Sequence, residues 1–554
     1  MLPHDASRND DTPAGTKYAA TASALFLVLV TPFVVFLNHH HYSLLNAEIA
    51  ACFGIAAASA LIVAPLARWP VLRVLAISFA VALAIDAQFT QLGQQEKVMA
   101  AVIFAGVGWV LREHLATIVA LTSLTFLVAT IGLGTTPEPT TLRLTGGNPA
   151  RPFVLHVVLD EHVGFAGMPR GARYDASIER LNSFFERYDF RRFNGAYSEY
   201  FWTRYTFSQM LNFSYGRYTP GLFRVGTNAQ FELVENKYFA RLAEEGYSVN
   251  VFQTTYLDSC ADPRTVAQCE TFEVAGIREL QFSQLDWTDR FFAVSTAYLN
   301  RLFIYGNLWH RVTRMARTES APQWLPAWAM GPIRALPPLF TKVLPEHYGP
   351  VAARALTARL IEAVSGARRG QYVFAHLMLT HYPYVYLPDC SLRRPAEWNS
   401  RTDPDAPPDT SNTVQGREER YVQYLDQMQC AYKDLGRLLD AIPEELQHDA
   451  VVILHGDHGS RINIIAPGAD NSRTLTPRDF SDSYSTLFAV KSPAVPAGDD
   501  GRLVAIGCVL ATFLESEFTR AAPDPSCDTE HKVFKVPFQS EVIAATAVAA
   551  PYRP

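Results

Sequence analysis

The chain has 554 residues, more than one compact domain usually needs, and hydrophobic residues make up 49% of it. Its formal net charge is −6 and its pI is near 6.2, and no basic stripe stands out, which argues against a nucleic-acid-binding protein. The apolar residues are unevenly distributed: residues 1–16 read as a polar tail, and residues 17–135 are almost free of charge.

Five apolar segments divide residues 17–135, and they lie near 18–37, 47–67, 71–88, 98–111 and 115–134. A membrane-spanning helix takes about 20 apolar residues, with a range of roughly 17–25. The fourth segment is short, so a count of four spans stays open beside a count of five. We expect a transmembrane bundle of about five helices, in preference to a cleaved signal peptide or a buried bundle of a soluble domain.

Basic residues beside these segments predict their orientation in the membrane. The tail, the second loop and the fourth loop are the richer positions; the first loop has no Lys or Arg, and the basic residues in chain order are Arg8, Lys17, Arg68, Arg73, Lys97 and Arg112. Basic loops stay on the cytoplasmic side. An odd number of helices then places the rest of the chain outside. The sequence therefore predicts a multi-pass inner or plasma membrane protein with an extracytoplasmic, periplasmic domain.

The cysteines give an independent indication of the compartment. Cys52 lies within a membrane segment, whereas the soluble part holds six others: Cys260, Cys269, Cys390, Cys430, Cys508 and Cys527. An even set is typical of disulfides in an oxidising compartment, and six cysteines allow 15 pairings. Sequence proximity favours Cys260 with Cys269 and Cys508 with Cys527, which leaves Cys390 with Cys430. Six reduced thiols are the alternative.

After a Pro/Gly/Thr-rich linker at 136–152, strand-like and helix-like segments alternate. Short apolar runs rich in β-branched and aromatic residues lie at 153–160, 247–254, 372–379, 450–457 and 485–493. Helical patterns lie between them, for example at 236–246 and 420–442, and a polar, Pro-rich stretch at 391–418 reads as a surface loop. This alternation predicts an α/β domain with a mostly parallel sheet flanked by helices on both faces.

Polar clusters follow three of the predicted strands. They are Asp160 with Glu161 and His162, His376 with His381, and Asp457 with His458. Taken singly, a carboxylate at a strand end is more often a helix cap, and a lone histidine is more often structural. The carboxyl ends of parallel strands, however, meet at one edge of a sheet, where open α/β folds bind ligands. Their convergence predicts a metal site.

Four motifs resemble one enzyme superfamily. They are "VVLDEHVG", "YFWTRYTFSQMLNF" at 200–213, "HLMLTHYPY" at 376–384 and "LHGDHGSR" at 454–461. In order and spacing they are similar to the sulfatase-like branch of the alkaline phosphatase superfamily, over residues 153–495. With a membrane bundle ahead of it, such a domain resembles the membrane-bound phosphoethanolamine and phosphoglycerol transferases. Residues 496–554 then form a C-terminal part of the soluble domain, and they carry no motif.

The resemblance implies roles for individual residues. The nucleophile falls on Thr203, with Thr206 as the fallback. The implied metal-binding residues are Asp160, Glu161, Thr203, Asp457 and His458. Those expected to bind the substrate are His376, His381 and Arg461.

The implied cofactor is one or two divalent metal ions. Carboxylate, imidazole and hydroxyl ligands favour zinc or manganese, with magnesium or calcium as alternatives. Such an ion activates a threonine hydroxyl, which is a weak nucleophile by itself, and neutralises charge on the transferred group. The stretch from Thr206 reads as the first turns of a helix, whose N-terminus offers free N–H groups to an anion.

Two departures from the superfamily limit the prediction. A formylglycine sulfatase needs Cys or Ser followed by x-Pro-x-Arg, and "CADPR" at 260–264 has its proline one place late. "LDEH" also differs from the single glutamate of the transferases. The sequence thus predicts a membrane-anchored, metal-dependent enzyme that acts on phospho- or sulfo-esters of envelope lipids or glycans through a threonine nucleophile. The alternatives are a hydrolase that releases the group to water, and a catalytically inactive binding module of the envelope.

Overall fold

The computed structural model describes residues 14–89, 94–133, 143–226, 229–274, 277–300, 348–394, 397–398, 406–407, 410–468, 475–521, 532–536 and 539–544. The chain separates into two compact units. The first comprises Met1–Glu138 and Leu280–Leu344, and the second comprises Pro139–Glu279 and Pro345–Pro554.

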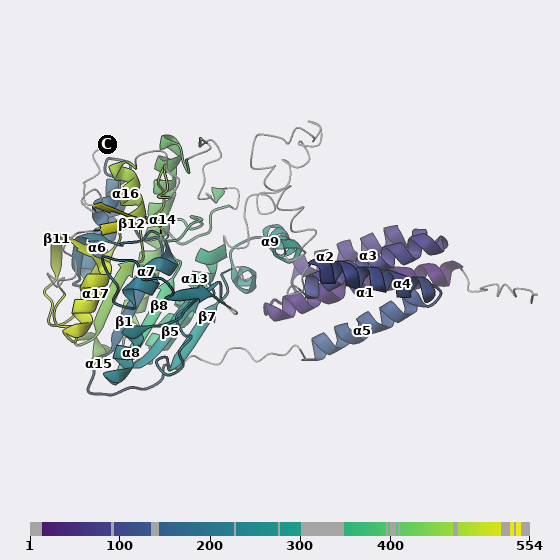
Figure 1. The fold of residues 1–554 in the computed structure, drawn as a ribbon, viewed down its shortest axis with the longest axis horizontal. Helices are drawn as coiled ribbons and strands as arrows, with labels where there is room; N and C mark the ends of the chain where they lie inside the picture. The colour runs from purple at the N-terminus through teal and green to yellow at the C-terminus, as the bar shows by residue number, and fades with distance from the viewer. Residues whose placement is uncertain are drawn as a thin grey trace, which may run out of the picture. The chain divides into compact units, whose positions relative to one another are not determined.

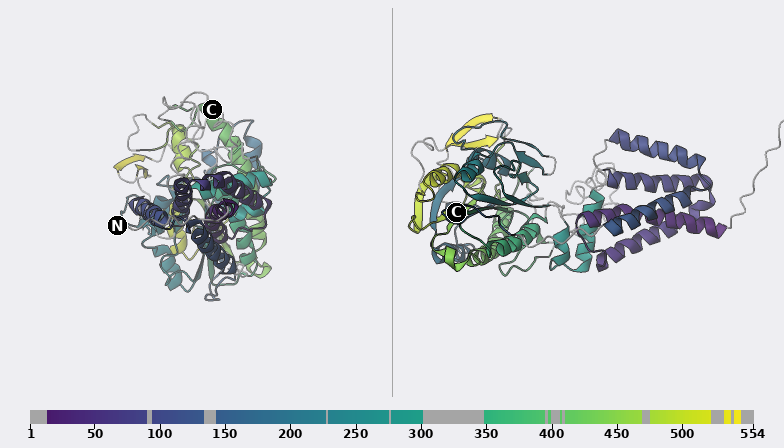
Figure 2. Two further views of the ribbon diagram at one scale, coloured as in Figure 1. Left: turned by 90° about the vertical axis from the view of Figure 1, so that its right-hand side faces the viewer. Right: turned by 90° about the horizontal axis from the view of Figure 1, so that it is seen from below.

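Apolar helices build the first unit (Figures 1 and 2). They are α1 (Ala14–His39), α2 (Ala47–Val63), α3 (Pro70–Gln88), α4 (Gln94–Val110) and α5 (Leu115–Leu133). Helix α1 packs against α2, α3 and α5, and α3 packs against α4. Four helices within the described residues are long and apolar enough to cross a membrane, and α4, with 17 residues, is at the lower limit of a span.

A later segment of the chain belongs to this first unit. Helix α9 (Trp287–Asn300) packs against α2. The Nε of Arg290 donates to Glu48 Oε1 over 2.9 Å, and the Tyr42 hydroxyl donates to the same oxygen over 2.6 Å. Glu48 is fully buried. A buried carboxylate needs such partners, so this contact ties α9 to α2, which the sequence did not predict.

The second unit is built on an eight-stranded sheet within its described residues (Figure 1). The strand order is β11-β2-β10-β9-β1-β8-β5-β7. Strands β1, β5, β7, β8 and β9 run parallel, whereas β10 is antiparallel to β9 and β2. The bounds of its strands are β1 (Val154–Leu159), β2 (Arg191–Tyr197), β5 (Ser248–Thr254), β7 (Gln268–Phe272), β8 (Gln371–Leu377), β9 (Val451–Gly456), β10 (Phe488–Lys491) and β11 (Gly498–Ala505).

Helices cover both faces of this sheet, because successive side chains of a strand point to opposite faces. Leu155, Val157 and Leu159 of β1 join one core cluster, whereas Val154 and Val158 join the other. The first cluster includes residues of α6 (Asp175–Arg187), α13 (Gly349–Val364) and α14 (Val414–Asp440). The second includes residues of α7 (Thr203–Met210), α8 (Lys237–Glu244) and α17 (Ile506–Glu515).

Short elements complete the second unit. Strands β3 (Phe223–Val225), β4 (Phe231–Leu233) and β6 (Leu257–Asp258) form a small sheet, and β12 (Lys532–Val536) pairs with β13 (Gln539–Ala544). The remaining described helices of this unit are the 3₁₀ turn Phe165–Gly167, α15 (Glu444–Gln447) and α16 (Pro477–Tyr484). Two further 3₁₀ turns are Ala64–Arg68, in the first unit, and Arg278–Phe282, where the chain passes from the second unit to the first.

The predicted α/β class with a mostly parallel sheet is confirmed. All five predicted strands occur, as β1, β5, β8, β9 and β10, with ends shifted by at most three residues. The sequence did not predict β2, β7 and β11. Helix α14 also begins at Val414, inside the loop expected at 391–418, because the side chain of Thr413 caps it by accepting from Gly416 N.

Disulfides staple the second unit, as the even number of cysteines predicted. Cys260 is bonded to Cys269 and Cys390 to Cys430, which confirms both pairings. Cys508 is also disulfide-bonded, and its predicted partner Cys527 lies outside the described residues. Within the described residues the free cysteine is Cys52, in α2.

Replacing both Cys390 and Cys430 by alanine should lower the free energy of unfolding of the second unit by about 2–4 kcal/mol, because the bond closes a loop of 40 residues. The matched control, alanine at Cys260 and Cys269, opens a loop of only 9 residues and should cost less. Urea unfolding of the detergent-solubilised chain measures both. A larger loss for the control pair would contradict this ordering.

A chain of buried polar side chains crosses the sheet on the α8 face. His156 Nδ1 lies 2.6 Å from the Tyr372 hydroxyl, and its Nε2 lies 2.7 Å from Nε2 of His455. The Tyr372 hydroxyl also lies 2.8 Å from that of Tyr238. Burial, and then the neighbouring His455, lower the pKa of His156 well below its ordinary value near 6.5.

Acid should therefore destabilise the fold through His156. As the pH falls below about 6.5, His156 becomes protonated in the unfolded chain but stays neutral in the folded chain. The free energy of unfolding therefore falls by up to about 1.4 kcal/mol per pH unit. His156→Gln keeps an amide in place of one ring nitrogen and removes the titration, so its slope should be smaller. Unfolding free energies of both proteins between pH 7 and pH 5 measure the slopes. Equal slopes would show that His156 does not carry this effect.

Candidate metal centre

Parallel pairing brings the predicted site residues to one edge of the sheet. Strand β1 lies between β8 and β9, with Leu159 opposite both Leu377 and Gly456. Asp160 follows the end of β1, and Asp457 and His458 follow the end of β9. The chain thus positions two carboxylates and one imidazole through the register of two neighbouring strands.

These three side chains form a compact, buried group. One potential ligand atom from each lies within 4.8 Å of the others. Nε2 of His458 lies 3.1 Å from Asp457 Oδ2 and 3.7 Å from Asp160 Oδ1. The other groups with metal-ligand spacing in the described residues each contain a pair of disulfide-bonded cysteines, so this group alone offers three free donors.

Two carboxylate oxygens in this group have no hydrogen-bond donor. Asp457 Oδ1 accepts from the backbone N–H groups of Glu161 and His458, and Asp160 Oδ2 lies 3.2 Å from His376 Nε2. The second oxygens, Asp457 Oδ2 and Asp160 Oδ1, are buried without a partner. Native buried polar atoms almost always have a partner. Two such oxygens beside an imidazole nitrogen are a donor set that fits a divalent cation such as zinc or manganese.

The structure distinguishes the two candidate threonines. Helix α7 begins at Thr203, three residues before the predicted start at Thr206. Thr203 Oγ1 is buried and lies 3.3 Å from His458 Nε2. Thr206 Oγ1 instead lies 3.0 Å from the hydroxyl of Ser198 and donates to the Tyr200 carbonyl. Thr203 therefore lies in the centre at the helix N-terminus, whereas Thr206 does not.

Three predicted residues form a second layer beside the centre. Glu161 Oε1 lies 3.3 Å from Arg461 Nε and 3.6 Å from His381 Nε2, so its carboxylate faces these side chains. Nη2 of Arg461 lies 2.5 Å from His458 Nε2. An ion bound at that nitrogen would displace this contact and leave Arg461 on Glu161. Both Glu161 and Arg461 have positive φ, at 63° and 55°, a strained conformation that is concentrated at functional sites.

The glycines of "HGDHG" are required by close packing. A Cβ on Gly456 would lie 2.3 Å from Thr486 Oγ1, and one on Gly459 would lie 2.4 Å from the Asp482 carbonyl oxygen. Neither glycine has a positive φ. These glycines therefore let neighbouring chain segments approach the candidate metal-binding segment closely.

Burial and neighbouring charges shift the pKa values of these groups in opposite directions. Burial raises the pKa of Asp160, but the imidazoles of His381 and His376 outweigh it and bring the pKa below its ordinary value. Burial and the charge of Asp160 raise the pKa of Asp457 to about 7. Burial lowers the pKa of His458 well below its ordinary value. A divalent cation would favour the ionised form of both carboxylates and the neutral imidazole.

Sequence reasoning missed a side chain next to Thr203. The guanidinium carbon of Arg204 lies 4.4 Å from the ring centre of Trp202 and 4.6 Å from that of Phe231, and the rings of Tyr205 and Phe223 lie within 5.9 Å. Within the described residues, no carboxylate forms an ion pair with Arg204. The aromatic run around "FWTRY" was the only signal in the sequence, and it does not reveal that β3 and β4 complete the cage.

Asp457→Asn should weaken zinc or manganese binding by at least about a hundredfold, because it removes a charged ligand that the other donors cannot replace. The control is Asp500→Asn, which removes a carboxylate held by Arg191 and Arg502 away from the centre. Calorimetric titration and elemental analysis of the purified chain measure binding. Full metal retention in Asp457→Asn would rule out the centre.

No family model matches the chain, and no curated protein matches it. Among solved structures, it is similar to the zinc complex of the C-terminal periplasmic domain of EcEptC from Escherichia coli, with 11% identity and a TM-score of 0.38, over 73% of this chain and 97% of that chain. It is also similar to a phosphonate monoester hydrolase of Agrobacterium radiobacter, with 13% identity and a TM-score of 0.37, over 66% and 74%. The sulfatase-like protein yidJ from Bacteroides fragilis matches with 14% identity and a TM-score of 0.36, over 69% and 77%.

Proposed function

We propose that this chain is a membrane-anchored, metal-dependent enzyme that transfers or hydrolyses phospho- or sulfo-ester groups of envelope lipids or glycans. The observation that carries the proposal is the buried group of Asp160, Asp457 and His458, with two carboxylate oxygens lacking a donor, beside the Thr203 hydroxyl. An inactive binding module would not need to keep buried acceptors without partners, since they cost free energy.

In this proposal Asp160, Asp457 and His458 hold the metal ion, with Thr203 as a further ligand. When bound, the ion would lower the pKa of the threonine hydroxyl and neutralise charge on the ester. Thr203 gives up its hydroxyl proton as Oγ1 attacks the phosphorus or sulfur atom, and the bond to the departing alcohol breaks as that alcohol takes up a proton. Water or a second alcohol then attacks the same atom and gives up a proton, and the bond to Thr203 Oγ1 breaks as Thr203 takes up a proton again.

The surrounding residues would orient this chemistry. His376 contacts Asp160 and holds the carboxylate in place. Arg461 and His381 flank Glu161 and are cationic or hydrogen-bonding groups for the non-bridging oxygens of the ester. Arg204, held by its aromatic cage, is suited to a further anionic part of the substrate.

The apolar helices of the first unit support the membrane anchor, and the disulfides of the second unit support an extracytoplasmic site. Counting α4 as a span makes five crossings and agrees with the outward side predicted from the loop charges. A site held at the membrane would meet lipids or envelope glycans as substrates. Hydrolysis and transfer share the first step and differ only in the acceptor.

Thr203→Ala should lower turnover of a chromogenic ester, 4-nitrophenyl phosphate or 4-nitrophenyl sulfate, by at least about a thousandfold, as expected for loss of a nucleophile. It should also abolish the covalent phospho- or sulfo-threonine. Metal binding should persist, because the three charged or imidazole ligands remain. Acid quench followed by peptide mass spectrometry detects the modified threonine, and metal analysis runs in parallel.

Thr206→Ala is the matched control, since it removes the same hydroxyl three residues along α7. It should keep the intermediate and most of the turnover. An intermediate that survives in Thr203→Ala and vanishes in Thr206→Ala would reverse the assignment. A wild-type chain loaded with zinc or manganese that turns over neither ester nor labelled envelope lipids would overturn the proposed activity.

A further inference from the structure

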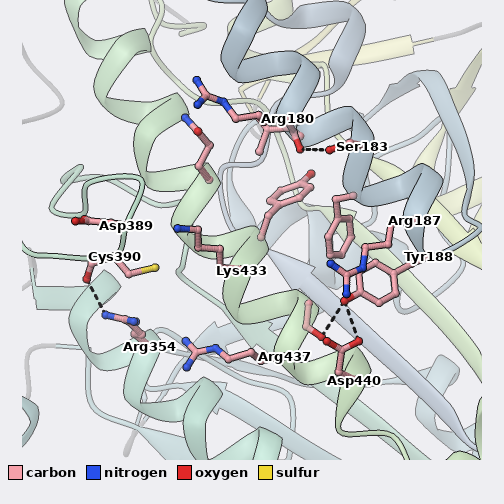
Figure 3. Close-up of a pocket in the computed structure, with 15 residues that line it drawn as sticks. Arg180, Ser183, Arg187, Tyr188, Arg354, Asp389, Cys390, Lys433, Arg437 and Asp440 are labelled. Atoms are coloured by element: carbon pink, nitrogen blue, oxygen red, sulfur yellow. Dashed lines mark hydrogen bonds between the residues drawn. The ribbon is translucent and has the colours of Figure 1, made fainter.

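A hollow of about 610 Å³ lies in the second unit, between α6, α13 and α14 (Figure 3). It shares no lining residue with the metal centre. Its volume is within the range of about 300–1,000 Å³ that small-molecule sites occupy. Five cationic side chains line it: Arg180, Arg187, Arg354, Lys433 and Arg437. They come from three helices that are distant in sequence, in a chain whose net charge is negative.

The acidic groups of the hollow already accept hydrogen bonds from neutral donors. Asp440 Oδ1 accepts from the Tyr188 hydroxyl over 2.9 Å, as the dashed line in Figure 3 shows. Asp389 Oδ1 accepts from the backbone N–H and the hydroxyl of Ser391, over 2.9 and 2.6 Å. Neither acid forms an ion pair with a lining cation in the part of the chain that the structure describes. The lining therefore keeps a positive excess.

The five cations divide into two sets. Arg354 and Arg437 both pair with the buried carboxylate of Asp434, which fixes their positions. Arg180, Arg187 and Lys433, in contrast, form no ion pair within the described ranges, and all three are exposed. These three can bind an incoming anion without first breaking an ion pair with the protein.

Aromatic rings also line the same hollow. The ring centre of Phe184 lies 4.9 Å from that of Tyr188 and 4.8 Å from that of Tyr432. The guanidinium carbon of Arg187 lies 5.3 Å from the Tyr188 ring centre. Rigid rings offer a flat, largely apolar surface at low entropic cost. A ligand that suits both parts carries an anionic group for the cations and a compact ring for the aromatic surface.

We propose that this hollow binds the phosphate group of a phosphorylated sugar or polyol ring, with the phosphate on the lining cations that form no ion pair within the described residues and the ring on Tyr188 and Phe184. Arginine binds phosphate oxygens through two parallel N–H groups, and lysine adds a point charge. The same chemistry occurs in a soluble sugar phosphate and in the head group of a lipid. This site goes beyond the proposed ester chemistry and lies outside its metal centre.

The test is calorimetric titration of the full-length chain in phosphatidylcholine nanodiscs with glucose 6-phosphate. A chelator is present throughout, so that binding at a loaded metal centre does not contribute. We expect saturable binding that glucose does not show and that weakens with added salt. Replacing both Arg187→Gln and Lys433→Gln should weaken binding by about tenfold or more, as loss of charge-assisted hydrogen bonds predicts.

Two further variants make the result decisive. Arg224→Gln with Lys237→Gln removes the same charge from exposed positions elsewhere and should leave binding unchanged. Ser183→Glu adds a negative charge to the lining without removing packing, because Ser183 is exposed on α6, and it should also weaken binding. Equal affinity in wild type, the Arg187/Lys433 double variant and Ser183→Glu, or no saturable binding in wild type, would overturn the proposal.

Nanodiscs that contain phosphatidylinositol 4-phosphate distinguish the two sources of ligand. If the lipid head group occupies the hollow, it will compete and raise the apparent dissociation constant for glucose 6-phosphate in wild type. If the ligand is soluble, the constant will stay the same. Because the chelator removes metal chemistry from the measurement, loss of ester turnover in the Thr203 experiment and loss of binding here are separate outcomes.

Discussion

Parallel pairing of β1 with both β8 and β9 is the constraint on which the rest of the site depends. This pairing aligns Leu159 with Leu377 and Gly456, so Asp160 emerges beside both Asp457 and His376. A shift of one residue in either register would turn the side chains that follow to the opposite face. A Cβ at Gly456 would clash with Thr486 Oγ1 and the His162 carbonyl oxygen, so a glycine is required at the end of β9 in this register.

Burying two carboxylates at this edge of the sheet costs free energy, and the surrounding residues offset only part of that cost. Asp160 and Asp457 are both buried, and burial, followed by the charge of Asp160, disfavours ionisation of Asp457 and raises its pKa to about 7. His376 and the backbone N–H groups of Glu161 and His458 compensate only one oxygen of each carboxylate. The remaining oxygens are the part of the site that a cation would stabilise.

The two faces of the eight-stranded sheet hold different groups of side chains. The face covered by α7 and α8 carries Thr203, which lies at the candidate metal centre, and the buried polar side chains around His156. The face covered by α6, α13 and α14 holds the Cys390–Cys430 bond and the cationic hollow. Tyr432 lies between the hollow and the candidate metal centre. Its ring lines the hollow, and its hydroxyl lies 2.8 Å from Nε2 of His162, two residues after Asp160.

The sequence by itself determined the features that depend on local patterns. Apolar runs of strand or helix length predicted β1, β5, β8, β9 and the apolar helices of the first unit, because period and length are properties of neighbouring residues. The order of polar clusters after three strands predicted that Asp160, His376 and Asp457 would converge, since parallel strands end at one edge. Proximity in the chain was enough to pair Cys260 with Cys269.

Tertiary structure decided what depends on contacts between distant segments. Thr203 rather than Thr206 is proposed as the nucleophile because of where α7 begins and which hydroxyl lies beside His458, and no glycine in that stretch marks the register. Glu161 pairs with Arg461, and both residues have positive φ, a conformation that neither residue type predicts. Helix α9 joins the first unit through Arg290 and Glu48, 242 residues apart, and the cationic hollow needs three helices to assemble. These features are set by the packing of the whole chain, so only the folded structure contains them.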